Sequence, residues 1–485
     1  MSRSEPVPRA LLLVALVTAT AAAACRSGPP GPPPPDAAAI VAGRGGAGVH
    51  VDSTDDPFTI GLEKGRWRTR EPSGAPRDFW EDVARLDIAR AERTAANIDE
   101  RTFAVALRQL MAGDPEGAAV AFGVLHRNAD DPLVRARSRI GLTMALTWNS
   151  DWQSIARMTA DPDSLAERDP RTVQAGVERW AHAFAGLPEA TVTMPDIPMT
   201  VPLRRSAFGT PVVTVLVNGH PHEFWLDTGA SMSLLSIDVA IEAGVRLAAT
   251  DTLALGVTSG HIDARAIYVD SLAIGRFVVR GLTAAVVNRD MMRLDQRVVG
   301  GVTNAVRIDG VIGADLIRRM DLVIDAAAGT LTIRRPQRDM RAARNLFWVG
   351  YPVVRVIARD GQPLLFGLDT GAEGSFVTPA LLRKLPRTPV AARRGAIGGL
   401  GAGTTQTEWV AREVRVSDGD FAIVLHNTPV APDRRWTFVS FDGIIGSDVA
   451  LATRLHLDFT NGVFDVRPSA VEENRRRSPS VTVGP

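Results

Sequence analysis

Hydrophobic residues recur with a helical period through the first part of the chain, over residues 76–190. One face of a predicted helix there carries Leu107, Leu110 and Met111. Two Asp-Pro pairs, Asp114-Pro115 and Asp131-Pro132, each provide a helix N-cap followed by a proline that suits the first helical turn. The pattern therefore predicts a domain of helical hairpins joined by short turns.

Beyond about residue 200 the period shortens to that of β-strands, with glycine and asparagine turns between the runs. The predicted strands include residues 212–217, 224–226, 266–274, 277–279 and 284–287. Two such β-rich segments, residues 200–338 and 345–468, follow one another. The fold class is therefore α+β and multidomain, with a helical-repeat-like N-terminal domain followed by a mainly-β region.

The N-terminus has the pattern of an export signal. An apolar run over residues 10–24 follows basic residues, is too short to span a bilayer comfortably, and ends at Cys25, the only cysteine. The context Ala22-Ala23-Ala24-Cys25 resembles a bacterial lipoprotein processing site, which implies lipidation at Cys25; the alternative is an ordinary cleaved signal. Because Arg26 follows, the resemblance implies an exported protein anchored at the periplasmic face of the outer membrane.

Two further segments have compositions that do not pack. Residues 26–75 include an almost pure Gly and Pro stretch, which predicts an extended linker after the export signal of residues 1–25. The polar tail over residues 469–485 is predicted to be disordered.

Overall charge excludes some functions. The 55 basic and 54 acidic residues leave a net charge of +1, so we expect no nucleic-acid partner. Lys64 and Lys384 are the only lysines, and neither stands in a phosphate-loop motif. A single cysteine also rules out a disulfide bond within the chain.

Two segments of the β-rich region repeat one another. Each has an apolar strand ending in the same four residues, Asp227-Thr228-Gly229-Ala230 in the first and Asp369-Thr370-Gly371-Ala372 in the second. Each continues to a second match of Asp-Gly, two aliphatic residues and Gly, within residues 309–315 and 442–448. The pattern predicts a duplicated unit.

A pair of such units suits acid–base chemistry. An aspartate at the end of a buried strand is partly desolvated, and a glycine two residues later lets backbone approach its carboxylate. Two carboxylates brought together share one proton, because both cannot ionise easily. One then serves as general base and the other as general acid, with a water between them.

These motifs resemble the retropepsin-like aspartic proteases, over about residues 207–468. The resemblance implies an internal pseudo-dimer whose catalytic residues are Asp227 and Asp369. Thr228 and Thr370 would cross-link the two loops by hydrogen bonds. The tight turns would be permitted by two glycines, Gly229 and Gly371.

The same family closes its cleft with a glycine-rich flap. Residues 395–403 stand where a flap is expected, and the candidate flap and substrate residues are Ile397, Gly398, Gly399 and Leu400. Residues 255–260 are a poorer match in the first half. The alternative is that the glycine-rich stretch is a mobile surface loop.

Other chemistries find little support. The sequence has no His-Glu-x-x-His zinc motif and no Gly-x-Ser-x-Gly nucleophile elbow, so we expect no metal and no cofactor. Structural hydrogen bonds are the expected role of four aspartates, Asp309, Asp315, Asp442 and Asp448. A metal pair at His220 and His222 is the alternative to simple solvent exposure.

The resemblance therefore implies an aspartic endopeptidase that acts on extended peptide or protein substrates. One alternative is a catalytically silent peptide-binding or envelope assembly protein with the same fold. Another is that each half pairs with its copy in a second chain. The helical hairpins resemble tetratricopeptide-type repeats, and they either bind a protein partner or cap the next domain.

Overall fold

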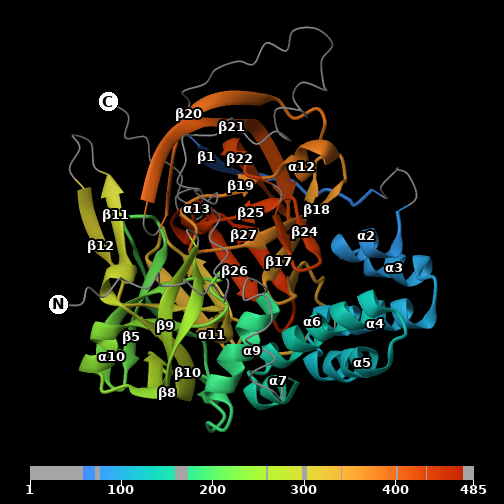
Figure 1. Cartoon of the computed structure of the whole chain (residues 1–485). Coiled ribbons are helices and arrows are strands. Elements are labelled where there is room, and N and C mark those ends of the chain that lie inside the picture. The colour runs from blue at the N-terminus through green and yellow to red at the C-terminus, as the bar shows by residue number, and fades with distance from the viewer. Residues whose placement is uncertain are drawn as a thin grey trace, which may run out of the picture.

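The computed structural model describes residues 58–70, 77–158, 173–257, 260–297, 303–339, 341–399, 402–432 and 434–472 of the 485-residue chain. Within these ranges a helical region is followed by a mainly-β region, as predicted (Figure 1). None of the helices in these ranges is long and apolar enough to cross a membrane. The expected export signal, Cys25 and almost all of the C-terminal tail lie outside the described residues.

The helical region begins just before Phe79 and ends near Phe184. Its helices are α2 (Phe79–Ala84), α3 (Ile88–Thr94), α4 (Ile98–Met111), α5 (Pro115–Asn128), α6 (Pro132–Trp148), α7 (Trp152–Met158) and α9 (Val173–Phe184). The side chain of Asp114 caps α5 by accepting from the Gly117 amide, and that of Asp131 caps α6 by accepting from the Leu133 amide. Both predicted caps are therefore confirmed.

The first lobe, residues 191–334, is built on a large mixed sheet. Its strands are β2 (Thr191–Thr193), β4 (Arg204–Arg205), β5 (Pro211–Val217), β6 (His220–Leu226), β7 (Leu234–Ser236), β8 (Arg246–Val257), β9 (Gly260–Ile274), β10 (Phe277–Val287) and β13 (Gly310–Ile312). The two strands expected over residues 277–279 and 284–287 are parts of the single strand β10. A hairpin of β11 (Arg293–Arg297) and β12 (Thr303–Arg307) projects from this lobe.

The second lobe, residues 346–467, has its own mixed sheet. The strands are β1 (Thr59–Lys64), β16 (Leu346–Trp348), β17 (Pro352–Ala358), β18 (Pro363–Leu368), β19 (Phe376–Val377), β20 (Val390–Gly399), β21 (Ala402–Ser417), β22 (Phe421–Pro429) and β25 (Gly443–Ile445). Short elements complete the two lobes: α10 (Ile237–Glu242), η1 (Arg289–Met292), α11 (Ala314–Ile317), α12 (Pro379–Lys384), β23 (Arg434–Trp436), β24 (Val439–Phe441) and α13 (Ser447–Ala452).

A third sheet joins the lobes. It contains β3 (Met199–Pro202), β14 (Asp321–Asp325), β15 (Thr330–Arg334), β26 (Arg454–Asp458) and β27 (Val463–Arg467). Strand β14 of the first lobe pairs antiparallel with β26 of the second, so backbone hydrogen bonds bridge the two lobes. One apolar core continues through both lobes and includes buried residues of this sheet, which fixes the relative position of the lobes.

Strand β1 corrects the expected linker. Residues 59–64 lie within the segment predicted to be extended linker, yet they pair antiparallel with β22 at the edge of the second lobe. Ile60 and Leu62 are half-buried against the common core. The alternation of apolar Ile60 and Leu62 with Gly61 and Glu63 is a strand pattern. The segment forms a strand because β22 provides a partner for its backbone.

The helical region packs on both lobes as a cap. Phe103 of α4 lies against Phe122 of α5 and against Phe438 of the second lobe, with ring centroids 5.3 and 5.7 Å apart. Trp180 and Phe184 of α9 share an apolar cluster with Trp225 of the first lobe. A protein partner for these helices and their repeat character remain predictions.

Candidate functional site

The two Asp-Thr-Gly-Ala loops occupy equivalent places in the two lobes. Strand β6 ends at Leu226, and the next residue, Asp227, donates its amide to Ile312 of the parallel strand β13 at 3.0 Å. In the second lobe β18 ends at Leu368, and Asp369 donates its amide to Ile445 of β25 at 2.9 Å. Each aspartate therefore begins a loop directly after a buried strand. The second matching segment of the same lobe pairs with that strand on one side.

A reciprocal hydrogen-bond network clamps the loops together. The Thr228 amide donates to the Thr370 hydroxyl oxygen, and the Thr370 amide donates to the Thr228 hydroxyl oxygen, both at 3.0 Å. The hydroxyl of Thr228 donates onward to the Leu368 carbonyl, and that of Thr370 to the Leu226 carbonyl. Each threonine thus binds both the loop and the strand end of the opposite lobe.

Two glycines allow the loops to meet. A Cβ atom at Gly229 would overlap the carboxyl carbon of Asp369, and one at Gly371 would overlap the carboxyl carbon of Asp227. From the sequence, these glycines are expected to permit tight turns. Their role in the structure is to let each backbone approach the carboxyl group of the other lobe.

The two carboxyl groups lie together at the centre of this arrangement. Asp227 and Asp369 share a hydrogen bond. Asp227 Oδ1 also accepts from the amides of Gly229 and Ala230 at 2.8 and 3.1 Å. Asp369 Oδ1 accepts likewise from two amides of its own loop, those of Gly371 and Ala372, at 3.1 and 3.0 Å.

Burial controls the protonation of the pair. Asp227 is 6% exposed and Asp369 is 0% exposed. Burial raises the pKa of both carboxyls, and the charge of Asp227 raises the pKa of Asp369 further, well above its ordinary value. The hydrogen bond from Asp369 opposes the rise in the pKa of Asp227. The pair therefore favours a state in which the two carboxyls share a single proton.

A serine–aspartate brace supports each loop. Ser233 donates to Asp315 in the first lobe, and Ser375 donates to Asp448 in the second, at 2.8 and 2.7 Å. Both hydroxyls also accept an amide from the facing strand end, that of Gly313 or Gly446. Burial raises the pKa of Asp448 to about 6.

The remaining two aspartates of the second matching segments also make structural contacts. Asp309 accepts from the Glu223 amide, and Asp442 accepts from the Leu365 amide and from Lys384 Nζ. The described residues contain no group of three or more His, Cys, Asp or Glu side chains that could hold a metal ion. His222 of β6 is buried rather than solvent-exposed, and its neighbour His220 is exposed.

Tyr351 is a neighbour of the pair that sequence reasoning missed. Its hydroxyl donates to Asp369 Oδ2 at 3.4 Å, and its ring lies 5.7 Å from that of Phe441. Tyr351 precedes β17, well before the Asp-Thr-Gly-Ala motif, and the first lobe has threonine, Thr210, before the equivalent strand β5. No repeated motif therefore marks Tyr351 in the sequence.

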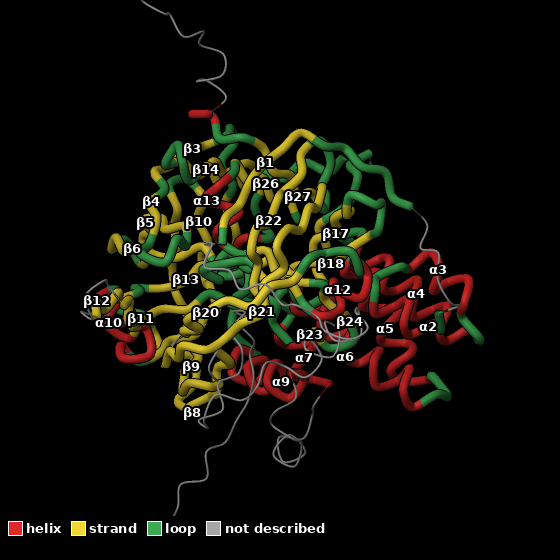
Figure 2. The backbone as a smooth tube through the Cα atoms, turned by 90° about the horizontal axis from the view of Figure 1, so that it is seen from above, coloured by secondary structure: helices red, strands yellow, loops and turns green. Residues whose placement is uncertain are grey.

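The glycine-rich segment forms a long hairpin. Strands β20 and β21 pair from Val390↔Ala411 to Gly399↔Ala402, so Ile397, Gly398 and Gly399 lie near its tip. Leu400, the fourth candidate flap residue, lies outside the described residues. Figures 1 and 2 agree that the hairpin arches from the second lobe towards the first.

One segment of this site is similar to a known family. Residues 213–316, which include Asp227 and β13, match a family model described as aspartyl protease. The crystal structure of a retropepsin-like aspartic protease from Rickettsia conorii is 19% identical, covers 30% of this chain and 94% of its own, and gives a TM-score of 0.20. No curated protein matches the chain. The first lobe therefore contains an aspartyl-protease-like segment, and Asp369 lies outside it.

Proposed function

We propose that the protein is an aspartic endopeptidase that hydrolyses peptide bonds with a water activated between Asp227 and Asp369. The observation that carries this proposal is the pair itself: two buried carboxyls from different lobes share a hydrogen bond and have raised pKa values. Such a pair holds the base and the acid that amide hydrolysis requires.

The proposed reaction assigns a role to each carboxyl. Ionised Asp227 takes a proton from the water, whose oxygen bonds to the scissile carbonyl carbon, while Asp369 gives its proton to the carbonyl oxygen. A tetrahedral diol forms. Asp227 then passes its proton to the amide nitrogen, the carbon–nitrogen bond breaks, and a diol proton returns to Asp369 as the carboxylic acid and amine leave.

The β20–β21 hairpin is our candidate flap. Its reach towards the first lobe supports a role over the cleft between the lobes, with Ile397, Gly398, Gly399 and Leu400 against an extended peptide substrate. Glycines at 398 and 399 leave backbone free to adapt when the hairpin opens and closes. An extended backbone beneath it would gain main-chain hydrogen bonds.

We also propose that the two lobes arose as a duplicated unit that forms one intramolecular site. In both lobes the strand before the aspartate pairs parallel with the second matching strand, which in turn pairs antiparallel with the strand after the loop. The serine–aspartate braces and threonine clamp follow the same symmetry. A single chain then supplies both carboxyls.

Export and lipid anchoring at Cys25 remain part of the proposal, on the strength of the N-terminal pattern. The catalytic site would then work in the cell envelope, at the periplasmic face of the outer membrane.

Cleavage of a mixed peptide library by the purified chain tests the proposed function. We expect new peptide termini with the wild type and none with the Asp227→Asn, Asp369→Asn double variant. The two proteins should have the same secondary-structure content, so that a loss of cleavage does not reflect unfolding. A transition-state mimic with a central hydroxyl should block cleavage. Peptide binding without cleavage in the wild type would instead identify a catalytically silent binding protein.

A further inference from the structure

A cavity lies between the helical region and the second lobe, with a volume of about 520 Å³. It is bounded by α3, α4 and the turn that follows α2 on one side and by β16, β17, β18 and α12 on the other. Its basic lining residues are Arg70, Arg77, Arg85, Arg90, Arg93, Arg108, Arg344, Arg355 and Lys384, against one acidic residue, Asp87. We call it the arginine pocket.

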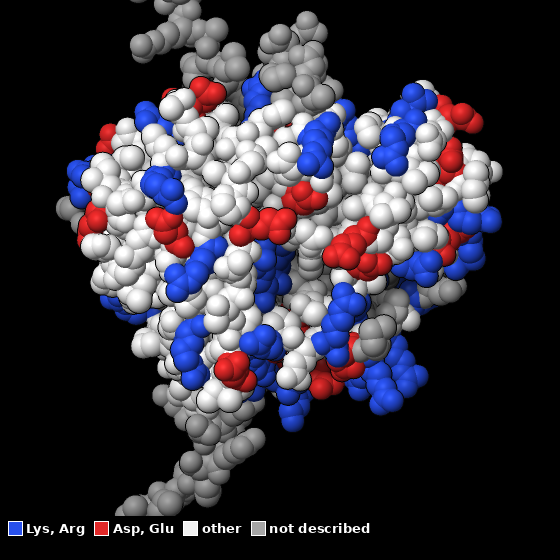
Figure 3. Space-filling model, turned by 90° about the horizontal axis from the view of Figure 1, so that it is seen from below, with Lys and Arg blue, Asp and Glu red and all other residues white. Residues whose placement is uncertain are grey.

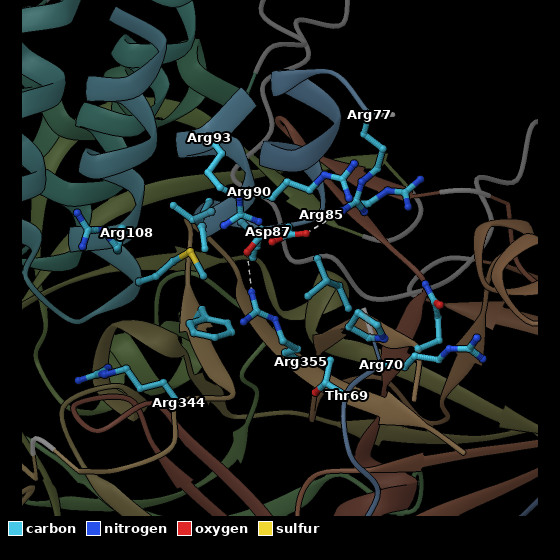
Figure 4. Close-up of a pocket in the computed structure, with 18 of the residues that line it drawn as sticks. Thr69, Arg70, Arg77, Arg85, Asp87, Arg90, Arg93, Arg108, Arg344 and Arg355 are labelled. Atoms are coloured by element: carbon cyan, nitrogen blue, oxygen red, sulfur yellow. Dashed lines mark hydrogen bonds and ion pairs between the residues drawn. The ribbon is translucent and has the colours of Figure 1, made fainter. Parts of the chain in front are cut away.

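This concentration of arginine is local. The whole chain carries a net charge of +1, and the face of the molecule in Figure 3 shows basic and acidic side chains interspersed. In the close-up of Figure 4, the labelled arginines surround the cavity, and Arg355 reaches into its middle. The pocket therefore departs strongly from the charge balance of the chain.

Some of these cations are already neutralised. Ion pairs shorter than 4 Å connect five of them to carboxylates: Arg77 to Asp82 and Asp87, Arg85 to Glu81, Arg90 to Asp82, Arg108 to Glu92, and Lys384 to Asp442. The other four, Arg70, Arg93, Arg344 and Arg355, have no carboxylate within this distance among the described residues.

Arg355 is the most informative of the four. Its Nη2 donates to the Leu86 carbonyl at 2.6 Å, and its guanidinium carbon lies 4.9 Å from the centroid of the Phe347 ring. Arg344 likewise donates one bond, to the Thr460 carbonyl at 2.7 Å. A guanidinium has five N–H donors, so both retain donors for a ligand. Burial lowers the pKa of both groups, a cost that a bound anion would offset.

The base of the pocket is apolar. Leu86, Met111, Phe347 and Leu365 line it and are almost completely buried. A cavity of this volume is the size of a small-molecule site and too confined for an extended acidic peptide. Guanidinium groups match the oxygens of phosphate in bidentate geometry, and several can bind one polyphosphate group.

We propose that the arginine pocket binds the polyphosphate or pyrophosphate group of an organic molecule, whose apolar body packs on Leu86, Met111 and Phe347. Arg355 binds from the second lobe, Arg344 from the segment just before that lobe, and Arg93 from the helical region. Arg70, which follows β1, completes the ring. The ligand therefore bridges the helical region and the second lobe. The proposal is independent of peptidase activity.

Calorimetric titration of the purified full chain with sodium tripolyphosphate and with ATP tests this, at fixed ionic strength with EDTA present. We expect saturable one-to-one binding, tighter for ATP because its organic body adds apolar contact. Arg70→Gln and Arg93→Gln replace exposed side chains, so both variants should fold. Each should weaken binding roughly two- to fivefold.

Arg101→Gln is the matched control, because Arg101 is exposed on α4 and does not line the pocket. Its affinity should equal that of the wild type. Equal weakening by Arg101→Gln, absence of saturable binding, or tighter binding of a glutamate peptide of the same charge would overturn the proposal.

A second experiment distinguishes a lipid pyrophosphate from a soluble polyphosphate as the ligand. Phosphatidylcholine vesicles with or without diacylglycerol pyrophosphate are sedimented with the protein. Binding to the doped vesicles that tripolyphosphate competes away supports a lipid pyrophosphate ligand. Binding of ATP without vesicle binding supports a soluble ligand. If neither tripolyphosphate nor the two pocket variants change vesicle binding, the result would count against the pocket as the binding site.

Discussion

Thr228 and Thr370, 142 residues apart, each accept the backbone amide of the other at 3.0 Å through their hydroxyl oxygens. Both side chains are almost completely buried. Buried amides that lose such a partner cost free energy, so this pair fixes the distance between the Asp227 and Asp369 loops more firmly than apolar packing alone would.

The clamp makes a first prediction. Thr228→Val removes the hydroxyl that accepts from the Thr370 amide and donates to Leu368. We expect a loss of about 1–3 kcal/mol in the free energy of unfolding for the buried amide left without a partner. Peptidase activity should fall as well, because the carboxyls lose their relative position. Denaturant titration and peptide cleavage measure the two effects.

Thr228→Ser is the control for this variant, since it keeps the hydroxyl. It should retain most of the stability and activity that Thr228→Val loses. Equal behaviour of the two variants would mean that the hydroxyl network does not hold the loops.

Replacing either aspartate tests whether the site is shared. Asp227→Asn or Asp369→Asn should each lower cleavage by roughly a thousandfold or more, and the double variant should be scarcely worse, because the residues act as a unit. Activity per molecule should not change on dilution. Substantial activity in either single variant, rising with protein concentration, would indicate that each half pairs with its copy in another chain.

The pH profile follows from the raised pKa values of the pair. At low pH both carboxyls are protonated and the base is lost; at high pH Asp369 also ionises and the acid is lost. We expect a bell-shaped profile with its maximum on the acidic side of neutral. Because burial and the Asp227 charge raise the pKa of Asp369, the alkaline limb of the activity profile should lie above the ordinary carboxyl range. Initial rates measured from pH 3 to 9 provide the check, and full activity at pH 9 would contradict the mechanism.

Asp418 gives the stability of the fold a pH dependence. Burial and the Asp465 charge raise the pKa of Asp418 to about 8, although its Oδ2 accepts the Val466 amide. A raised acid pKa means that the folded state binds the proton more tightly than the unfolded state. The contribution of protonated Asp418 to the free energy of unfolding is fully present below about pH 4 and is lost as the pH rises through 8.

Asp418→Asn should therefore lose less stability than the wild type between pH 5 and pH 9, because the amide cannot ionise and still offers an oxygen to Val466. Thermal unfolding at several pH values measures the difference. Asp420, an exposed residue of the same turn, provides Asp420→Asn as a control that should follow the wild type. Parallel curves for all three proteins would exclude this role.

Anchoring is tested at Cys25. Cys25→Ser should abolish incorporation of labelled fatty acid and release the protein from the membrane fraction, because the only thiol available for lipidation is gone. Fractionation and lipid labelling in a bacterial host measure this. Unchanged labelling of the variant would refute lipidation at this residue.

Local sequence patterns are enough to predict many of the individual elements and the candidate chemistry. Helix caps at Asp114 and Asp131, strand alternation, and the two Asp-Thr-Gly-Ala motifs depend on neighbouring residues, whose spacing is visible in one dimension. The repetition of the motif also predicted that Asp227 and Asp369 belong together, because equivalent units tend to present equivalent loops.

Contacts between groups far apart in the chain depend on how the elements pack in three dimensions. Strand β1 exists because β22 offers its edge, and Tyr351 reaches Asp369 from outside either motif. The arginine pocket gathers residues from Arg70 to Lys384. The β1–β22 pairing and the Tyr351 contact form within the second lobe, whereas the arginine pocket forms where the helices pack on that lobe. Sequence periodicity records which face of an element is apolar, but it does not specify which other element covers that face.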